Sequence, residues 1–138
     1  MKRTLMCLLA LFLVELALAQ EKQSSAVKTE MLLQTSEAWN GSTYKSYPSG
    51  QPQVTVLKLT IPPRTAINCH KHPALNVGYV LSGDITVETQ SGDKKHFVTG
   101  QAIPETVNTV HRGVTGAQGA VLIVFYAGAP GVPLSQQP

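Results

Sequence analysis

The sequence contains only two cysteines, Cys7 and Cys69. Cys7 lies in an apolar N-terminal run that we expect to be removed, so Cys69 would be the only thiol of the mature chain. A single thiol cannot form an internal disulfide, although an exported protein would permit one. The fold must therefore be held by its apolar core, by a partner chain or by a metal ion.

Charged residues are also scarce, at 14% of the chain, and the lysines are scattered rather than clustered. A basic stripe or patch is the electrostatic footprint of nucleic-acid binding. The formal charge of +3 falls to +2 once the N-terminal run with Lys2, Arg3 and Glu15 is removed. We therefore expect no nucleic-acid partner.

Residues 1–19 have the organisation of a secretion signal rather than of folded structure. The dipeptide at 2–3 is basic, residues 5–18 are almost wholly apolar, and the ALA sequence at 17–19 is a small-x-small cleavage site. The apolar run is shorter than the roughly 20 residues of a membrane-spanning helix and contains a glutamate. We predict an exported protein, periplasmic or extracellular, with no membrane association after cleavage.

No helical periodicity follows the signal. Short runs of Val, Ile, Leu, Thr and Tyr instead alternate with Gly, Pro, Asn and Asp, which predicts an all-β sandwich or barrel. Hairpin turns are expected at Ser82-Gly83-Asp84 and Ser91-Gly92-Asp93. The predicted strands are 53–60, 66–70, 78–81, 84–90, 95–98, 101–103, 109–112 and 119–126.

The length of 138 residues fits one domain. Residues 20–50 begin with a polar stretch, and we expect them to form a flexible leader and an N-terminal arm, with Trp39 as a packing anchor. The β-barrel is expected over residues 51–127. The Pro/Gly-rich residues 128–138 are expected to form an irregular tail.

Two histidines, His70 and His72, are separated by one residue. On a strand, residues two apart point to the same face, because successive side chains alternate. Two imidazoles on one face form half of a metal site. The pair alone is a weak signal, since such pairs are more often accidents of the surface.

The wider pattern, over roughly residues 52–127, resembles the cupin family. Cupins carry a first motif, G-x5-H-x-H-x3-E-x6-G, and a second, G-x5-P-x-G-x2-H-x3-N. The run YVLSG that ends at Gly83 is similar to the family's strand–turn signature, and the second motif starts at Gly100. The family spacing places His70, His72, Asn76 and Gly83 in slots of the first motif, and His111 in the histidine slot of the second.

The resemblance implies a cupin double-stranded β-helix, or jelly-roll barrel, in which His70, His72 and His111 bind one divalent metal ion. The ion would be Fe, Mn, Ni, Cu or Zn. The resemblance also implies a small-molecule ligand or substrate. Cupins commonly pair through edge strands, so a homodimer is expected.

Several residues depart from the motifs: Arg64 and Asn108 replace glycines, Thr106 a proline, Thr115 an asparagine and Asn76 the glutamate ligand. The last change removes a negatively charged ligand from the predicted site. An amide oxygen can replace it, but it binds a metal ion more weakly than a carboxylate does. Either three histidines and water hold the ion, or a carboxylate arrives from another part of the chain.

Glu105 is the candidate for that carboxylate. If Ile103 faces inward, strand alternation puts Glu105 on the same inner face. A carboxylate inside a barrel is costly unless it meets a cation. Glu105 would then act as a metal ligand or as a general base. Alternatively, the strand register slips at Pro104 and Glu105 faces water.

Two functions fit these features. The first is an exported metal-dependent enzyme, dioxygenase-like or a lyase or isomerase, that acts on a small organic molecule. The second is a non-catalytic module that binds a metal or a small ligand. Fold does not choose between them, because one scaffold hosts many functions.

Overall fold

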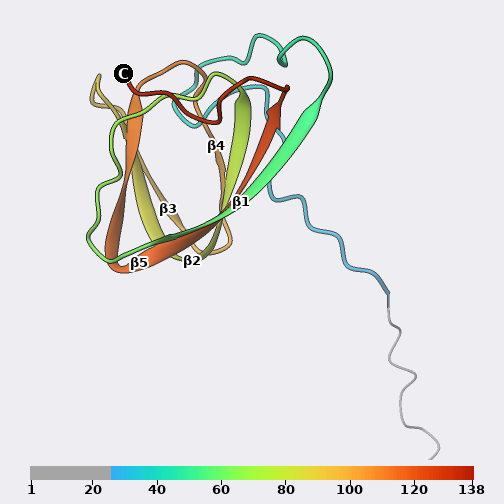
Figure 1. Cartoon of the computed structure of the whole chain (residues 1–138). Helices are drawn as coiled ribbons and strands as arrows, with labels where there is room; N and C mark the ends of the chain where they lie inside the picture. Colours follow the sequence, from blue (N-terminus) through green and yellow to red (C-terminus); the bar gives the residue numbers. More distant parts are fainter. Residues whose placement is uncertain (1–25) are drawn as a thin grey trace, which may run out of the picture. The chain divides into compact units, whose positions relative to one another are not determined.

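The computed structural model describes residues 26–138, and the predicted secretion signal at 1–19 lies outside these described residues. Residues 26–30 carry neither strand nor helix. Residues 31–138 form one unit that contains every strand the structure describes. These strands are β1 (Gln53–Ile61), β2 (Leu75–Thr89), β3 (Lys94–Val98), β4 (Ala102–Pro104) and β5 (His111–Gly128) (Figure 1).

The strands pair antiparallel in the order β1-β5-β2-β3, and β4 pairs with β2. Figure 1 shows that the long strands β2 and β5 bend, so that the sheet curls around an interior. The described residues include no helix, and hence none that could cross a membrane. The all-β prediction is confirmed.

The hairpin turn predicted at Ser82-Gly83-Asp84 is wrong, because the chain continues there as a bulge within β2. Gly83 has a φ of 76° and Gly119 of β5 a φ of 74°. A Cβ on Gly83 would collide with the backbone carbonyl of Gly119, so two glycines are needed where the strands bend together. The predicted strands 78–81 and 84–90 are therefore parts of β2.

The other predicted turn, at Ser91-Gly92-Asp93, is confirmed as the link between β2 and β3, where the Thr89 amide donates to the Asp93 carbonyl at 2.9 Å. The predicted strands 109–112 and 119–126 lie mostly within β5. No named strand forms at 66–70, since only isolated bridges join this segment to β5.

Arg64 and Asn108, the residues in two glycine slots of the cupin motifs, both adopt left-handed backbone, with φ of 49° and 58°. An L-residue pays about 1–2 kcal/mol for that conformation. Each has a backbone hydrogen bond, because the Arg64 amide donates to Gly116 and the Asn108 amide to His72, at 2.9 and 2.8 Å. The turns thus keep the glycine geometry without glycine.

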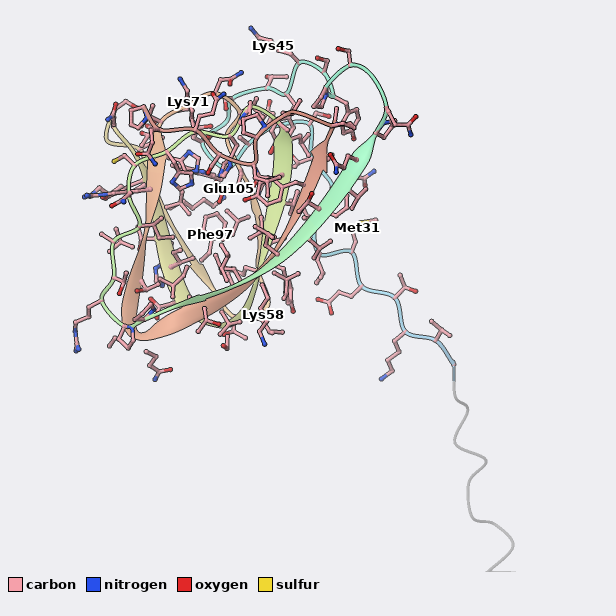
Figure 2. All side chains as sticks on the ribbon, in the orientation of Figure 1. Met31, Lys45, Lys58, Lys71, Phe97 and Glu105 are labelled. Carbon is pink, nitrogen blue, oxygen red and sulfur yellow. The ribbon has the colours of Figure 1, made fainter. Side chains whose placement is uncertain are left out.

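The core lies inside the curled sheet. β2 alternates buried and less buried residues along most of its length, as expected for a strand with one face in a core. Figure 2 shows Phe97 inside the barrel and Lys58 outside it. The fully buried apolar side chains are Val80, Ile85, Val87 and Ile103.

Candidate metal centre

Backbone pairing brings the two histidine segments together. His70 and His111 form an isolated antiparallel bridge in which each amide donates to the other's carbonyl at 2.9 Å. His72 forms a parallel bridge with Val107. The three imidazole rings therefore face one another, with centroids 4.7 to 5.0 Å apart.

One ring nitrogen from each histidine lies within 4.8 Å of the other two, so the three could hold a metal ion. His72 and His111 are almost completely buried, at 4% and 2% exposure, and His70 is partly exposed. The sequence pattern thus named the three residues that the fold places together.

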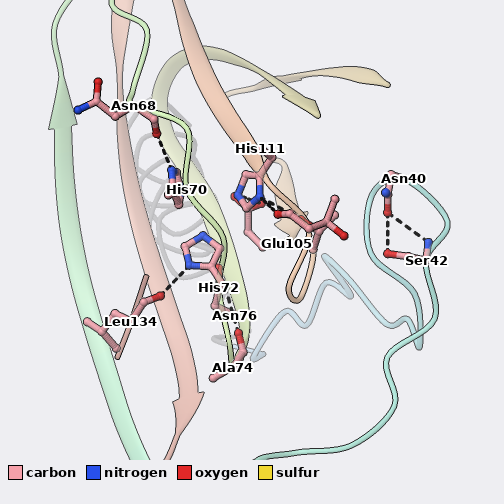
Figure 3. Close-up of polar contacts among 12 residues, drawn as sticks. Asn40, Ser42, Asn68, His70, His72, Ala74, Asn76, Glu105, His111 and Leu134 are labelled. Carbon is pink, nitrogen blue, oxygen red and sulfur yellow. Dashed lines mark hydrogen bonds and ion pairs between the residues drawn. The ribbon is translucent and has the colours of Figure 1, made fainter. Parts of the chain in front are cut away.

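Each histidine has its Nδ1 within hydrogen-bonding distance of a backbone carbonyl, and Figure 3 shows this contact for His70 and His72. A carbonyl can only accept, so Nδ1 donates and carries the proton of the neutral ring. Nε2 is then a free lone pair, which is how second-shell carbonyls orient metal-binding histidines. The carbonyls are those of Asn68 at 2.8 Å, Leu134 at 2.7 Å and Thr109 at 2.9 Å, for His70, His72 and His111 respectively.

Burial also favours the neutral rings. It lowers the pKa of His72 to about 4 and lowers the pKa of His111 from its ordinary value, because both rings lose hydration on entering the barrel. The positive charge that the neighbouring histidines would carry acts in the same direction. Metal binding needs unprotonated imidazole, so these two rings are prepared for it at neutral pH.

Glu105 follows β4 and points into the same cavity. Ile103 is completely buried, and the Glu105 side chain keeps only 14% exposure. The register slip that would turn Glu105 to water does not occur. Its Oε2 lies 3.3 Å from His111 Nε2, and burial raises the pKa of the carboxyl to about 7.

The N-terminal arm holds the backbone around Glu105. The Trp39 amide donates to the Pro104 carbonyl at 2.8 Å, and the Tyr44 hydroxyl donates to the Glu105 carbonyl at 2.9 Å. Trp39 is buried, as expected for a packing anchor. No sequence pattern indicated the contribution of Tyr44, since its partner is a backbone atom 61 residues away.

Three polar side-chain atoms around this cavity are buried without a hydrogen-bond partner: Asn76 Oδ1, Glu105 Oε2 and His111 Nε2. The last two both present lone pairs at 3.3 Å, which is unfavourable unless a cation or a proton lies between them. Two donors bound to one ion at about 2.1 Å are about 3.0–3.4 Å apart at octahedral or tetrahedral angles. The spacing of this pair therefore fits two ligands of one divalent ion, and the three imidazoles form the group whose ligand atoms lie within 4.8 Å of one another.

Thr106, which replaces the proline of the second cupin motif, also belongs to the site. It is completely buried, and its hydroxyl lies 3.0 Å from His111 Nδ1. Thr115 likewise has a structural partner, because its hydroxyl donates to the Pro62 carbonyl at 2.7 Å and accepts from the Thr65 amide at 2.9 Å. Two departures from the motif are thus hydrogen-bonded in place.

The site opens into a cavity of about 390 Å³. The three histidines, Asn76 and Glu105 form part of its wall. The rest is mostly apolar and comes largely from β1, β2 and β5.

The C-terminal segment closes part of this cavity. Residues 129–138 include the Leu134 carbonyl that binds His72 and a bridge in which Lys71 and Gln136 exchange backbone hydrogen bonds at 3.0 and 2.9 Å. Leu134, Ser135 and Gln137 line the cavity. The Pro/Gly-rich composition predicted an irregular tail and gave no indication of this role.

Solved structures with a similar fold include a cupin-like protein. A cupin-like protein from Thermotoga maritima MSB8 matches with a TM-score of 0.53 at 13% identity, over 62% of this chain and 64% of that one. The DMSP lyase DddQ from Ruegeria pomeroyi DSS-3 matches with a TM-score of 0.51 at 15% identity, over 70% of this chain and 46% of that one.

KdgF from Halomonas sp. matches with a TM-score of 0.50 at 20% identity, over 61% of this chain and 78% of that one. This chain spans less than half the length of the DMSP lyases that it matches. No protein-family model matches the sequence, and no curated protein is similar to it. The matches show a shared fold.

We predict that deleting residues 132–138 weakens Co²⁺ binding by about 10- to 100-fold, the usual effect of removing a second-shell partner of a ligand. The reason is that His72 loses the Leu134 carbonyl that fixes its tautomer. Titration of Co²⁺ followed by visible absorption measures the affinity. Nitrogen NMR of the imidazoles reports the tautomer of His72 directly.

A control chain that lacks only Pro138 keeps the Leu134 carbonyl and should bind Co²⁺ as the full chain does. Thermal melting of both metal-free chains separates loss of affinity from loss of folding. Undiminished Co²⁺ affinity in the longer deletion would show that the tail plays no part in the site.

Proposed function

We propose that this chain, which has the cupin fold, is an exported metal-dependent enzyme acting on a small organic molecule. The ion is divalent, of the set Fe, Mn, Ni, Cu and Zn, and is held by Nε2 of His70, His72 and His111. The observation that carries the proposal is the group of three imidazoles whose ligand nitrogens lie within 4.8 Å of one another, with Glu105 Oε2 3.3 Å from His111 Nε2 beside them.

Glu105 supplies the carboxylate that the motif lacks at Asn76. Leaving a buried polar atom unsatisfied costs about 1–3 kcal/mol, so two such atoms aimed at each other imply a group that binds both. With Glu105 as a ligand, the site gains the negative charge that three imidazoles do not provide. Asn76, whose Oδ1 is also unpartnered, offers a neutral oxygen from β2, where its backbone carbonyl accepts the Glu105 amide at 3.1 Å.

The cavity favours catalysis over a purely structural ion. Structural metal sites are closed by protein ligands, whereas catalytic sites keep an open position. Here the histidines face a cavity of about 390 Å³, which leaves room for a ligand beside the ion. A bound divalent ion would polarise an oxygen ligand, lower the pKa of water or, if redox-active, react with dioxygen.

The residues of this chain would prepare that chemistry. The carbonyls on each Nδ1 hold the rings, the apolar wall limits access of water, and Glu105, whose pKa burial raises to about 7, can take up or release a proton near neutral pH. The fold neighbours include DMSP lyases, so a lyase is one reaction class that this scaffold supports. Dioxygenase-like and isomerase chemistry remain the other classes of the proposal.

The homodimer is part of the proposal and is supported by an exposed apolar surface on β1 and β5. Val54 and Val56 are 62% and 58% exposed, and Phe125, which pairs with Val56, is 41% exposed. In the described part of the chain β1 pairs only with β5, so its other edge is free. A second copy would cover both the side chains and the edge.

Export is the remaining part of the proposal. It rests on the basic, apolar and small-x-small organisation of residues 1–19.

We predict one divalent ion per chain and a loss of Co²⁺ affinity of at least about 100-fold in His111→Ala, because one of the three imidazole ligands is removed while the backbone bridge to His70 is kept. His96→Ala is the matched control, since His96 lies on the surface with 54% exposure of its side chain. Elemental analysis gives the stoichiometry. Equal metal content in both variants would refute the site.

Glu105→Gln tests the carboxylate, and we expect about tenfold weaker Co²⁺ binding because the amide is neutral. Unchanged affinity with lost turnover would instead assign Glu105 as a general base. Turnover is measured as oxygen uptake and product release over a panel of phenols, thiols and small acids. Tight metal binding without any turnover would favour the non-catalytic module.

For the dimer, light scattering of the eluting protein should give twice the chain mass. Val56→Glu should give monomers, because it places a charge in the apolar surface, whereas Gln90→Glu on the exposed β2–β3 turn should not. A monomeric parent chain would exclude the dimer.

For export, a host secreting the full chain should release a protein whose first residue is Gln20, as measured by intact mass. Retention inside the cell with residues 1–19 intact would argue against a secretion signal.

A further inference from the structure

The cavity has two chemically different ends. Its polar end contains the three histidines, Asn76 and Glu105. The remaining wall is mostly aliphatic, and its polar members, Asn68, Tyr126, Ser135 and Gln137, are uncharged. The aliphatic side chains are Leu57, Leu59, Ile67, Ile85, Val87, Leu122, Val124 and Leu134. A ligand that places one group at the polar end must therefore place the rest of its body against hydrocarbon.

No lysine or arginine is among the residues that line this cavity, all of which belong to the described part of the chain. Glu105 is the only acidic side chain in the lining. A second carboxylate or a phosphate on the ligand would lose its hydration without meeting a cation, which is strongly unfavourable. A cationic group among the aliphatic residues would likewise lack a partner.

We infer that the ligand carries a single oxygen head group, bound at the histidine end, on an uncharged apolar body, and that Gly113 sets how long that body can be. This rests on the proposed metal function. Dicarboxylates and phosphate esters are disfavoured as ligands of the cavity by the same lining, because it offers their second charge no basic side chain.

Gly113 lies in β5, is buried and lines the cavity. A Cβ on Gly113 would lie 2.6 Å from Ile85 Cδ1 and 3.4 Å from Ile67 Cδ1, and both isoleucines line the same cavity. The methyl end of Ile85 can rotate, and the closely packed core leaves the cavity as the free space for it. Gly113→Ala therefore shortens the apolar part of the cavity.

Gly128 offers a matched control on the same strand. A Cβ there would meet nothing closer than the Gln53 carbonyl at 3.6 Å, an ordinary contact, and Gly128 does not line the cavity. Neither glycine has a positive φ, so alanine strains neither backbone.

The test uses Co²⁺-loaded protein and straight-chain alkyl hydroxamates from acetohydroxamate to decanohydroxamate, with affinity followed by the Co²⁺ visible spectrum. The dissociation constant should fall about three- to fourfold per added methylene until the cavity is filled, because each methylene leaves water. A hydroxamate of equal length with a terminal carboxylate should bind at least about tenfold more weakly.

In Gly113→Ala the affinity for hydroxamates should stop rising at a shorter alkyl chain than in the parent protein. In Gly128→Ala it should stop rising at the same alkyl chain length as in the parent protein. Thermal melting checks that both variants fold. If Gly113→Ala does not fold, the comparison of methyl and carboxylate ends on the parent protein still decides the inference.

A normal Co²⁺ spectrum with affinity independent of chain length, or with equal binding of the carboxylate-ended hydroxamates, would overturn this inference and leave the proposed metal function standing. If the protein gives no Co²⁺ spectrum before any hydroxamate is added, the proposed function is overturned, and this inference with it.

Discussion

The site depends on one reciprocal backbone contact, the pair of hydrogen bonds between His70 and His111 at 2.9 Å each. These residues come from segments on either side of β2, β3 and β4, and neither segment alone carries three imidazoles. The bridge sets both side chains on one face of the barrel, and His72 follows because it lies two residues beyond His70. A slip of one residue in this pairing would turn the His111 ring out of the cavity.

Other contacts refine what this bridge assembles. Backbone carbonyls choose the tautomer of every ring, and one of them belongs to the C-terminal segment. The N-terminal arm holds the backbone at Glu105 through Trp39 and Tyr44. The N-terminal arm and the C-terminal segment thus both contribute to a site whose side chains come from the middle of the sequence, because groups far apart in sequence meet at the cavity.

The fold class and the three histidines were predictable, since spacing along a strand and the cupin motifs are local properties of the sequence. The inward orientation of Glu105 was predictable from strand alternation, because the apolar Ile103 two residues earlier fixes which face is inside. The sequence predicts a hairpin turn at Gly83, where the structure has a bulge. The two cannot be told apart locally, because a glycine flanked by Ser and Asp is typical of both. Tyr44 and Leu134 were not predictable, since each contributes through a hydrogen bond between a side chain and a backbone carbonyl about 60 residues apart.

The separation of the ligands along the chain has a consequence for metallation. An unfolded chain offers only the imidazoles of His70 and His72 as neighbours, so the full donor set exists only after β2 to β5 have assembled. A chain that crosses a membrane unfolded would acquire its ion where it folds. If the chain is exported unfolded and binds a metal as proposed, the supply of divalent metals in the compartment where it folds would compete with their order of affinity in deciding which ion is bound.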